Sequence, residues 1–196
     1  MTCLILAAYD TEGVYVYQAF RPPIVQAALQ KGTFEAGFSL DRMTWIKPSF
    51  GWMLYRSSYG TKPDQEAILK IKLTHAGFGA ILAQSVESTF DPASYESRDV
   101  WQRAVAESEV RHQWDPDRLL NGDKHADRRA IQIGLRGAAV RQYVDEWIIG
   151  LEDVTALAHA VHDAVRNKGN GLPEVPEERV YPVDAPIARR LGITAE

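Results

Sequence analysis

The sequence feature that most constrains the fold is an apolar strand that turns at a proline into a helix, within residues 43–60 (MTWIKPSFGWMLYRSSYG). Residues 43–46 are typical of the end of a strand, and Pro48 stops that strand because proline has no backbone N–H. Apolar residues at helical spacing follow and predict a helix over residues 49–59. The first turn of a helix has free N–H groups, so we expect phosphate or another anion to bind there.

The same stretch is rich in aromatic residues and also contains Lys47 and Arg56. Its aromatic residues are two tryptophans, two tyrosines and a phenylalanine. Core strands do not ordinarily hold two cations, and surface loops do not ordinarily gather so much aromatic mass. The stretch therefore indicates a ligand site, although it does not identify a reaction by itself.

The composition is typical of one soluble domain. The chain has 196 residues, 45% of them hydrophobic and 24% charged, which is enough to bury a core. A net charge of -4 excludes a global basic field for nucleic acid, so any such contact needs a local patch. The single cysteine, Cys3, excludes an internal disulfide and a cysteine-based zinc cluster. Apolar runs are too short to span a membrane and no basic leader precedes them, so we expect a cytoplasmic protein without a membrane partner.

Strand and helix patterns alternate along the chain and predict an α+β fold. We expect a single domain over residues 1–166, with mixed, mostly antiparallel small sheets flanked by short helices. Residues 167–196 are rich in Gly, Pro and Glu and predict a peripheral tail. Strands are expected at residues 3–8, 14–20, 66–74, 110–114 and 129–135, a polar loop at 115–127, and helices at 24–30, 75–85, 97–108, 137–143, 154–165 and 185–191. Residues 147–151 fit a strand or a helix end.

Other charged clusters give weaker signals. His159 and His162 share a helix face, but two ligands are too few for a zinc site, which favours a packing role. The acidic residues between 115 and 127 alternate with cations and lack the spacing of a calcium loop. The cations just before residue 130 are either a solvated loop or a site where Arg129 contacts an anion. Motifs for a serine hydrolase, a P-loop and a Rossmann dinucleotide site are absent from the sequence.

Several motifs resemble those of the domain-of-unknown-function family 4291, which consists of small proteins of bacteria and fungi. The resemblance extends over about residues 9–165. It rests on VYQAF at residues 16–20, MTWIKPSFGWMLYRS at 43–57, QWDP at 113–116, RAIQIGL at 129–135 and YVDEWI at 143–148. This family implies no particular activity.

A more distant likeness does imply an activity. The order of elements is similar to that of ADP-ribosyltransferase folds, which bind NAD in a cleft between two small sheets. The resemblance implies that Gln18 or Arg21 contacts the nicotinamide ribose or diphosphate, and that Thr44, Ser49 and Tyr55 lie around the nicotinamide. At the strand where the usual transferase has a catalytic glutamate, this chain has Arg129 and Gln132. An arginine on this strand is more similar to the pattern of the RNA 2′-phosphotransferases of the same fold, which hold phosphates with arginine and histidine.

The residue types are consistent with NAD chemistry. Transfer from NAD passes through a cationic ribosyl centre, so an enzyme needs cations on the diphosphate and an aromatic wall for the nicotinamide. The candidate cations are Arg21, Lys47, Arg56 and Arg129, and the candidate wall is Trp45, Trp52 and Tyr55. We therefore expect an NAD-dependent, ADP-ribosyltransferase-like enzyme that acts on a nucleic-acid or phosphorylated acceptor.

In this hypothesis Arg129, Gln132 and Arg56 are the catalytic residues, and they converge with the other cations on one pocket. Two alternatives remain open. One is a non-catalytic module in which the same aromatic and cationic side chains bind a nucleotide or single-stranded nucleic acid. The other is that the aromatic residues simply form the core.

Overall fold

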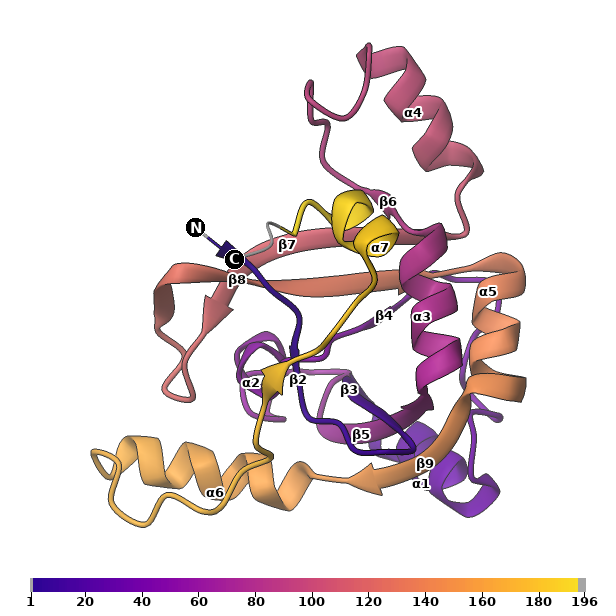
Figure 1. Ribbon diagram of the computed structural model, residues 1–196. Helices are drawn as coiled ribbons and strands as arrows, with labels where there is room; N and C mark the ends of the chain where they lie inside the picture. The colour runs from indigo at the N-terminus through magenta and orange to yellow at the C-terminus, as the bar shows by residue number, and fades with distance from the viewer. Residues whose placement is uncertain (1, 194–196) are drawn as a thin grey trace.

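The two longest strands form the centre of the largest sheet (Figure 1). In the computed structural model, which describes residues 2–193, β7 (Val110–Arg118) and β8 (Lys124–Leu135) are antiparallel neighbours. On the other side of β8 lie β1 (Thr2–Cys3), which is parallel to it, and β4 (Thr44–Ile46), which is antiparallel. A short strand, β6 (Val86–Glu87), runs parallel to β7 at the edge, so the sheet is mixed.

The β7–β8 pair is longer than the sequence predicted. Most of the polar segment 115–127, expected to be a loop, continues the two strands. Cross-strand polar pairs explain the difference: Arg128 Nε lies 2.5 Å from Asp117 Oδ2, and Gln132 Nε2 donates to Asp115 Oδ2 over 2.6 Å. Such pairs stabilise a ladder that has little apolar alternation to identify it in the sequence.

A second, antiparallel sheet consists of β3 (Gly13–Phe20), β5 (Ala67–Thr74) and β9 (Ile148–Asp153), in the order β3-β5-β9. Residues 147–151, which the sequence left open between strand and helix, therefore belong mainly to a strand. β5 alternates buried apolar residues with Lys70 and Lys72, as its sequence predicted. Buried side chains from both sheets form one apolar cluster, so the main core lies between them.

Helices close the remaining sides of the core. α1 (Pro22–Lys31) begins at two prolines and ends at Gly32, which adopts a left-handed conformation with φ of 82°. α3 (His75–Gln84), α5 (Gly137–Gln142) and the π-helix η1 (Tyr143–Trp147) flank the two sheets at one end. α6 (Thr155–Arg166) contributes to a smaller apolar cluster with α2 (Phe50–Ser57). α4 (Arg98–Glu107) projects away from the body and buries none of its residues.

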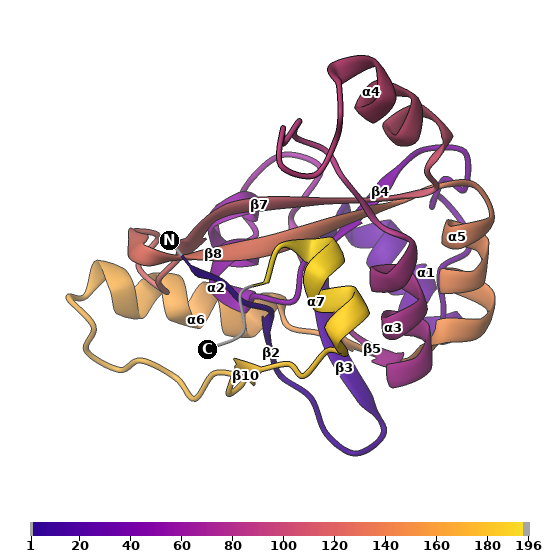
Figure 2. The ribbon, with the colours of Figure 1, turned by 45° about the horizontal axis from the view of Figure 1, so that its top comes forward.

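The C-terminal segment, expected to be peripheral, returns across the body (Figure 2). Its strand β10 (Arg179–Val180) pairs with β2 (Leu6–Ala7), and Tyr181 and Leu191 join the main core. α7 (Ala185–Leu191) begins at an Asp184 cap, and the carbonyl of Leu191 accepts a hydrogen bond from the Trp114 indole over 2.9 Å. Residues 2–193 thus form an α+β domain with three sheets and seven α-helices. Within that range, no helix is both long and apolar enough to cross a membrane.

Candidate functional site

The two main sheets meet where β4 ends, and a pocket opens beside this junction. β4 pairs with β8 of the large sheet, whereas the next residue, Lys47, exchanges backbone hydrogen bonds with Tyr17 of β3 over 2.7 and 3.2 Å. Pro48 then breaks the strand, and Ser49 caps α2 by accepting from the Trp52 N–H over 3.3 Å. The strand-to-helix turn predicted from the sequence therefore lies at the junction of the two sheets.

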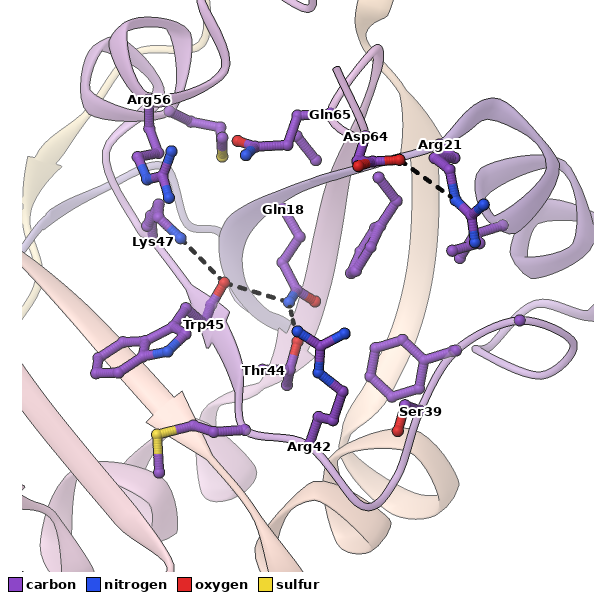
Figure 3. A pocket seen from close by; sticks show the side chains of 17 residues that line it. Gln18, Arg21, Ser39, Arg42, Thr44, Trp45, Lys47, Arg56, Asp64 and Gln65 are labelled. Carbon is purple, nitrogen blue, oxygen red and sulfur yellow. Dashed lines mark hydrogen bonds and ion pairs between the residues drawn. The ribbon is translucent and has the colours of Figure 1, made fainter. Parts of the chain in front are cut away.

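The pocket has a volume of about 620 Å³ and is open to solvent. It lies between the end of β3, the start of α1, the loop before β4 and the inner side of α2 (Figure 3). Its polar and charged lining residues are Gln18, Arg21, Ser39, Arg42, Thr44, Lys47, Arg56, Asp64 and Gln65. Its aromatic lining residues are Phe20, Phe38 and Trp45.

A hydrogen-bonded network holds the pocket floor. The side chain of Gln18 is 2% exposed, and its Nε2 donates to Thr44 Oγ1 over 2.6 Å and to the Trp45 carbonyl over 3.2 Å. The buried Tyr143 hydroxyl donates to Gln18 Oε1 over 2.7 Å. All these buried polar groups have partners, so β3, β4 and η1 hold the floor in one geometry.

Cations dominate the charge of the pocket. Arg21, Arg42, Lys47 and Arg56 line it together with a single carboxylate, that of Asp64. This carboxylate lies 3.8 Å from Arg21 Nε in an exposed ion pair. With four cations and one carboxylate, the pocket has an excess of positive charge in a chain that is acidic overall. The exposed ion pair itself contributes little to stability.

Lys47 is the most unusual of these cations because it is only 6% exposed. Its Nζ donates to the Trp45 carbonyl over 3.1 Å and lies 5.3 Å from the centre of the Trp52 ring. No carboxylate of residues 2–193 lies within 4.0 Å of it. Burial, and then the charge of Arg56, lower the pKa of Lys47 to about 7, while Asp115 opposes the change.

Asp115 cannot neutralise Lys47 directly because two amides hold its carboxylate. Asp115 Oδ1 accepts from Gln113 Nε2 over 2.9 Å, and Oδ2 accepts from Gln132 Nε2 over 2.6 Å. Burial raises the pKa of this carboxyl above its usual value, and the two amide hydrogen bonds limit that rise.

Aromatic rings form the apolar side of the pocket. Phe38 stacks on Phe34 with ring centres 4.3 Å apart, and Phe20 meets Phe38 edge to face at 5.8 Å. Trp45 lies against Gly134 of β8, where an added Cβ would be 3.0 Å from the indole. A planar ligand group therefore has aromatic surfaces available beside the cations.

Of the eleven residues that the sequence placed in the site, six line this pocket: Gln18, Arg21, Thr44, Trp45, Lys47 and Arg56. Ser49, Trp52 and Tyr55 belong to α2 but are not among the lining residues. Trp52 packs near the Lys47 ammonium, and Tyr55 lies beneath the guanidinium of Arg118, whose Cζ is 3.6 Å from the ring centre.

Arg129 and Gln132, expected to be catalytic, do not line the pocket either. Arg129 Nη1 donates to the Trp114 carbonyl over 3.0 Å, and Gln132 holds Asp115. Of the four cations expected to converge, Arg21, Lys47 and Arg56 line one pocket, whereas Arg129 is engaged across the β7–β8 ladder.

The expected anion site at the start of α2 is filled by the chain itself. Glu178, from the C-terminal segment, accepts from the Phe50 N–H through Oε1 over 2.5 Å. Burial raises the pKa of Glu178 to about 8, and the charge of Asp117 adds to this effect. The free N–H groups were predicted correctly, but an external ligand cannot reach this one because Glu178 lies on it.

Sequence reasoning missed Arg42, Asp64, Phe20 and Phe38, which complete the pocket. Arg42 and Phe38 lie in an irregular loop between α1 and β4, and Asp64 lies in a turn after α2. No periodic pattern marks such residues. The one available signal for Arg42 was a cation two residues before the strand that begins at Thr44.

Comparison with known families places almost the whole chain in one group. Residues 4–181 match the family model described as Domain of unknown function (DUF4291). No curated protein matches the chain significantly. In residues 2–193, no cluster of three or more His, Cys, Asp or Glu side chains is arranged to hold a metal ion.

Proposed function

Because the chain belongs to the DUF4291 family, whose description names no activity, we propose a function from the pocket itself: it binds a phosphate-bearing nucleotide, with NAD as the candidate. The excess of cations over carboxylates in the pocket supports this proposal most strongly. Three of the four cations are arginines, whose planar guanidinium groups form paired hydrogen bonds with phosphate oxygens.

The arrangement of the pocket fits the two parts of a nucleotide. Arg21, Arg42 and Arg56 are exposed at the rim, where a solvated phosphate arrives first. Phe38 and Trp45 offer ring surfaces on which a base or a nicotinamide stacks. At the floor, the Thr44 hydroxyl accepts from Gln18 and keeps its own O–H, which is suited to orienting a ribose or an amide.

Catalysis is a further step of this proposal. In an ADP-ribosyl transfer from NAD, the bond between the ribose and nicotinamide breaks, nicotinamide leaves, and the acceptor bonds to the ribose carbon. Arg56 and Lys47 would hold the diphosphate, which stays with the transferred group, while positive charge develops on the ribose. The acceptor would enter from the open side of the pocket. Arg129 and Gln132 would then act only through the large sheet, because neither lines the pocket.

The runner-up is a module that binds single-stranded nucleic acid without catalysis. One observation favours it: three exposed arginines surround an open pocket, which suits a ligand that extends beyond it. Binding of this kind depends steeply on salt because several phosphates release counterions, whereas a single nucleotide shows a weaker dependence.

Quenching of tryptophan fluorescence, followed by calorimetry, tests the proposal. We expect NAD and ADP-ribose to quench the wild-type protein, because Trp45 lines the pocket, and Arg42→Gln to weaken both by about tenfold. Arg166→Gln, an exposed arginine on α6, is the matched control and should change nothing. Quenching by a short oligonucleotide alone would favour the module, and quenching by neither would reject the pocket as a nucleotide site.

A further inference from the structure

Lys47 has the surroundings of a reactive amine rather than those of a structural ammonium. We infer that Lys47 is a nucleophile that forms an imine with the carbonyl carbon of a phosphate-bearing aldehyde or ketone in the pocket. This inference rests on the proposed function, since the pocket arginines hold the phosphate, and it extends that function to a class of substrate.

Within the described part of the chain, one hydrogen bond orients the amine. Lys47 Nζ donates to the Trp45 carbonyl over 3.1 Å, and Gln18 Nε2 donates to the same oxygen over 3.2 Å (Figure 3). Gln18 is itself hydrogen-bonded to Thr44 and Tyr143, and these bonds fix the position of the carbonyl that orients the amine. One N–H therefore points at the backbone, and the nitrogen lone pair remains available to the pocket.

Other lysines of the same domain show the contrasting arrangement. Lys72 Nζ lies 2.6 Å from Glu12 and 2.9 Å from Asp10, and Lys70 Nζ lies 3.0 Å from Glu152. Their carboxylates stabilise the charged form, and those of Glu12 and Asp10 raise the pKa of Lys72 above its ordinary value. Lys47 has a backbone carbonyl in place of a carboxylate, together with a neighbouring guanidinium.

The electrostatics support the same chemistry. Burial and the charge of Arg56 together lower the pKa of Lys47 to about 7, so a large fraction of the amine is uncharged near neutral pH. A lysine that is desolvated and placed beside another cation is an established route to an activated amine nucleophile. The ammonium form would have no lone pair with which to attack a carbonyl carbon.

The reaction needs no oxidant or reductant. The Nζ lone pair attacks the carbonyl carbon, the C=O electron pair moves to oxygen, and a proton passes from nitrogen to that oxygen to give a carbinolamine. Loss of water then forms the C=N bond, and hydrolysis reverses both steps. Because Lys47 lines a pocket that is open to solvent, the water released and the water needed for hydrolysis have a route through the pocket.

Labelling with a pair of matched aldehydes tests the inference. Pyridoxal 5′-phosphate and pyridoxal differ in the phosphate, and pyridoxal also closes into a hemiacetal that lowers its free aldehyde. Labelling of Lys47 is therefore expressed relative to labelling of Lys168 by the same reagent, and borohydride reduction followed by peptide mass mapping locates the adducts. We expect Lys47 to be labelled before the exposed Lys168, and its relative labelling rate to be about tenfold higher with the phosphorylated reagent, because charge-assisted hydrogen bonds from the arginines hold the phosphate. This factor corresponds to about 1.4 kcal/mol.

The outcomes separate the inference from the proposed function. Equal labelling of Lys47 by both reagents would support the nucleophile and reject phosphate binding. If adducts form only on other lysines although phosphate still binds in the pocket, the nucleophilic role of Lys47 is overturned and the binding function stands. Absence of both effects would reject both.

A pH profile measured with pyridoxal excludes a merely structural lysine. The labelling rate of Lys47 should rise with a midpoint near pH 7, as its pKa requires. Arg56→Gln should move that midpoint to higher pH, because it removes a cation that disfavours the ammonium. Asp115→Asn should move it to lower pH, because it removes the opposing charge. A midpoint that neither substitution moves would contradict the inference.

Discussion

Two charged clusters adjoin α2, and they are built in opposite ways. Beside its start, the carboxylate of Asp117, 2% exposed, is paired with Arg128 at 2.5 Å and also accepts from the Ser49 hydroxyl and the Arg118 N–H. Beside the pocket, Lys47 donates to a backbone carbonyl, has no carboxylate within 4.0 Å among residues 2–193, and has Arg56 as a neighbouring charge. We call these the paired cluster and the unpaired cluster.

The difference indicates what each cluster is for. A buried charge with a partner maintains one arrangement of the chain, and removing the partner is costly. A buried cation without a carboxylate destabilises the fold unless something else compensates, and sites of this kind are concentrated where ligands bind. The paired cluster therefore joins β7, β8 and α2, whereas the unpaired cluster is ready for an anion.

Breaking the paired cluster should give the largest effect. Asp117→Ala leaves Arg128 without its carboxylate, and we expect it to lower the free energy of unfolding by about 3 kcal/mol, with Arg128 partly exposed and able to recover some hydration. Urea denaturation measures the change. Asp123→Ala, an exposed acid on the same hairpin, should stay within about 0.5 kcal/mol, and similar losses in both variants would contradict the assignment.

Removing the buried charge of the unpaired cluster should act in the opposite direction. The folded pKa of Lys47 is about 7 and its ordinary value is 10.5, so between these values the unfolded state binds more protons and stability rises with pH. Lys47→Met abolishes this penalty. We expect it to increase the free energy of unfolding by about 2 kcal/mol at or below pH 7, and the gain to vanish above pH 10.5.

Thermal or urea denaturation at several pH values checks the Lys47→Met prediction. The same variant should lose ligand binding while being more stable, which separates a functional lysine from a structural one. A variant that is less stable than the wild type at pH 6 would show that Lys47 supports the fold.

Replacing one arginine of each cluster by glutamine, in separate variants, tests the contrast between the clusters. Arg56→Gln should weaken nucleotide binding by about tenfold and change stability by less than about 0.5 kcal/mol, because Arg56 is exposed and has no ion pair among residues 2–193. Arg128→Gln should lower stability and leave the affinity unchanged. Calorimetric titration and urea denaturation of both variants would show whether the two effects separate; a pair of variants that each lose both properties would remove the distinction.

The smallest effect is expected at Glu178, which lies beside the paired cluster. Its pKa is raised to about 8 in the folded protein from an ordinary 4.5, so the folded state binds more protons between these pH values. The contribution of Glu178 to stability is therefore complete below pH 4.5 and is lost as the pH rises through 8. Glu178→Gln keeps an acceptor for the Phe50 N–H without the charge. Because the Glu178 side chain is only partly buried, we expect less than the full pKa difference implies: a gain of about 1 kcal/mol above pH 8 and none at pH 4. Equal stability of variant and wild type at both pH values would place Glu178 in solvent.

Much of the fold was predictable because local rules determine it. Alternation predicted β5, and a terminal glycine predicted the end of α1. The proline turn predicted the passage from β4 to α2. The extension of β7 and β8 was not predictable, because its stability comes from polar pairs between residues far apart in the chain, such as Asp117 with Arg128.

The site was predictable in part for the same reason. Lys47 and Trp45 are next to the proline turn, so a local pattern identified them. Arg129 has the same parity along β8 as the buried Ile131 and Ile133, which directs it away from the face that carries Gln132. Alternation alone contained this information. The positions of Arg42 and of the Glu178 carboxyl depend on long-range packing, which no local pattern encodes.

Proton uptake on ligand binding tests the central claim most directly. Calorimetric titration with ADP-ribose at about pH 8, in buffers of different ionisation enthalpy, measures how many protons enter the complex. An anion held beside Lys47 raises the pKa of this amine, so the account predicts uptake of a fraction of a proton that disappears in Lys47→Met. Binding without proton uptake, or equal affinity in the wild type and Lys47→Met, would contradict it.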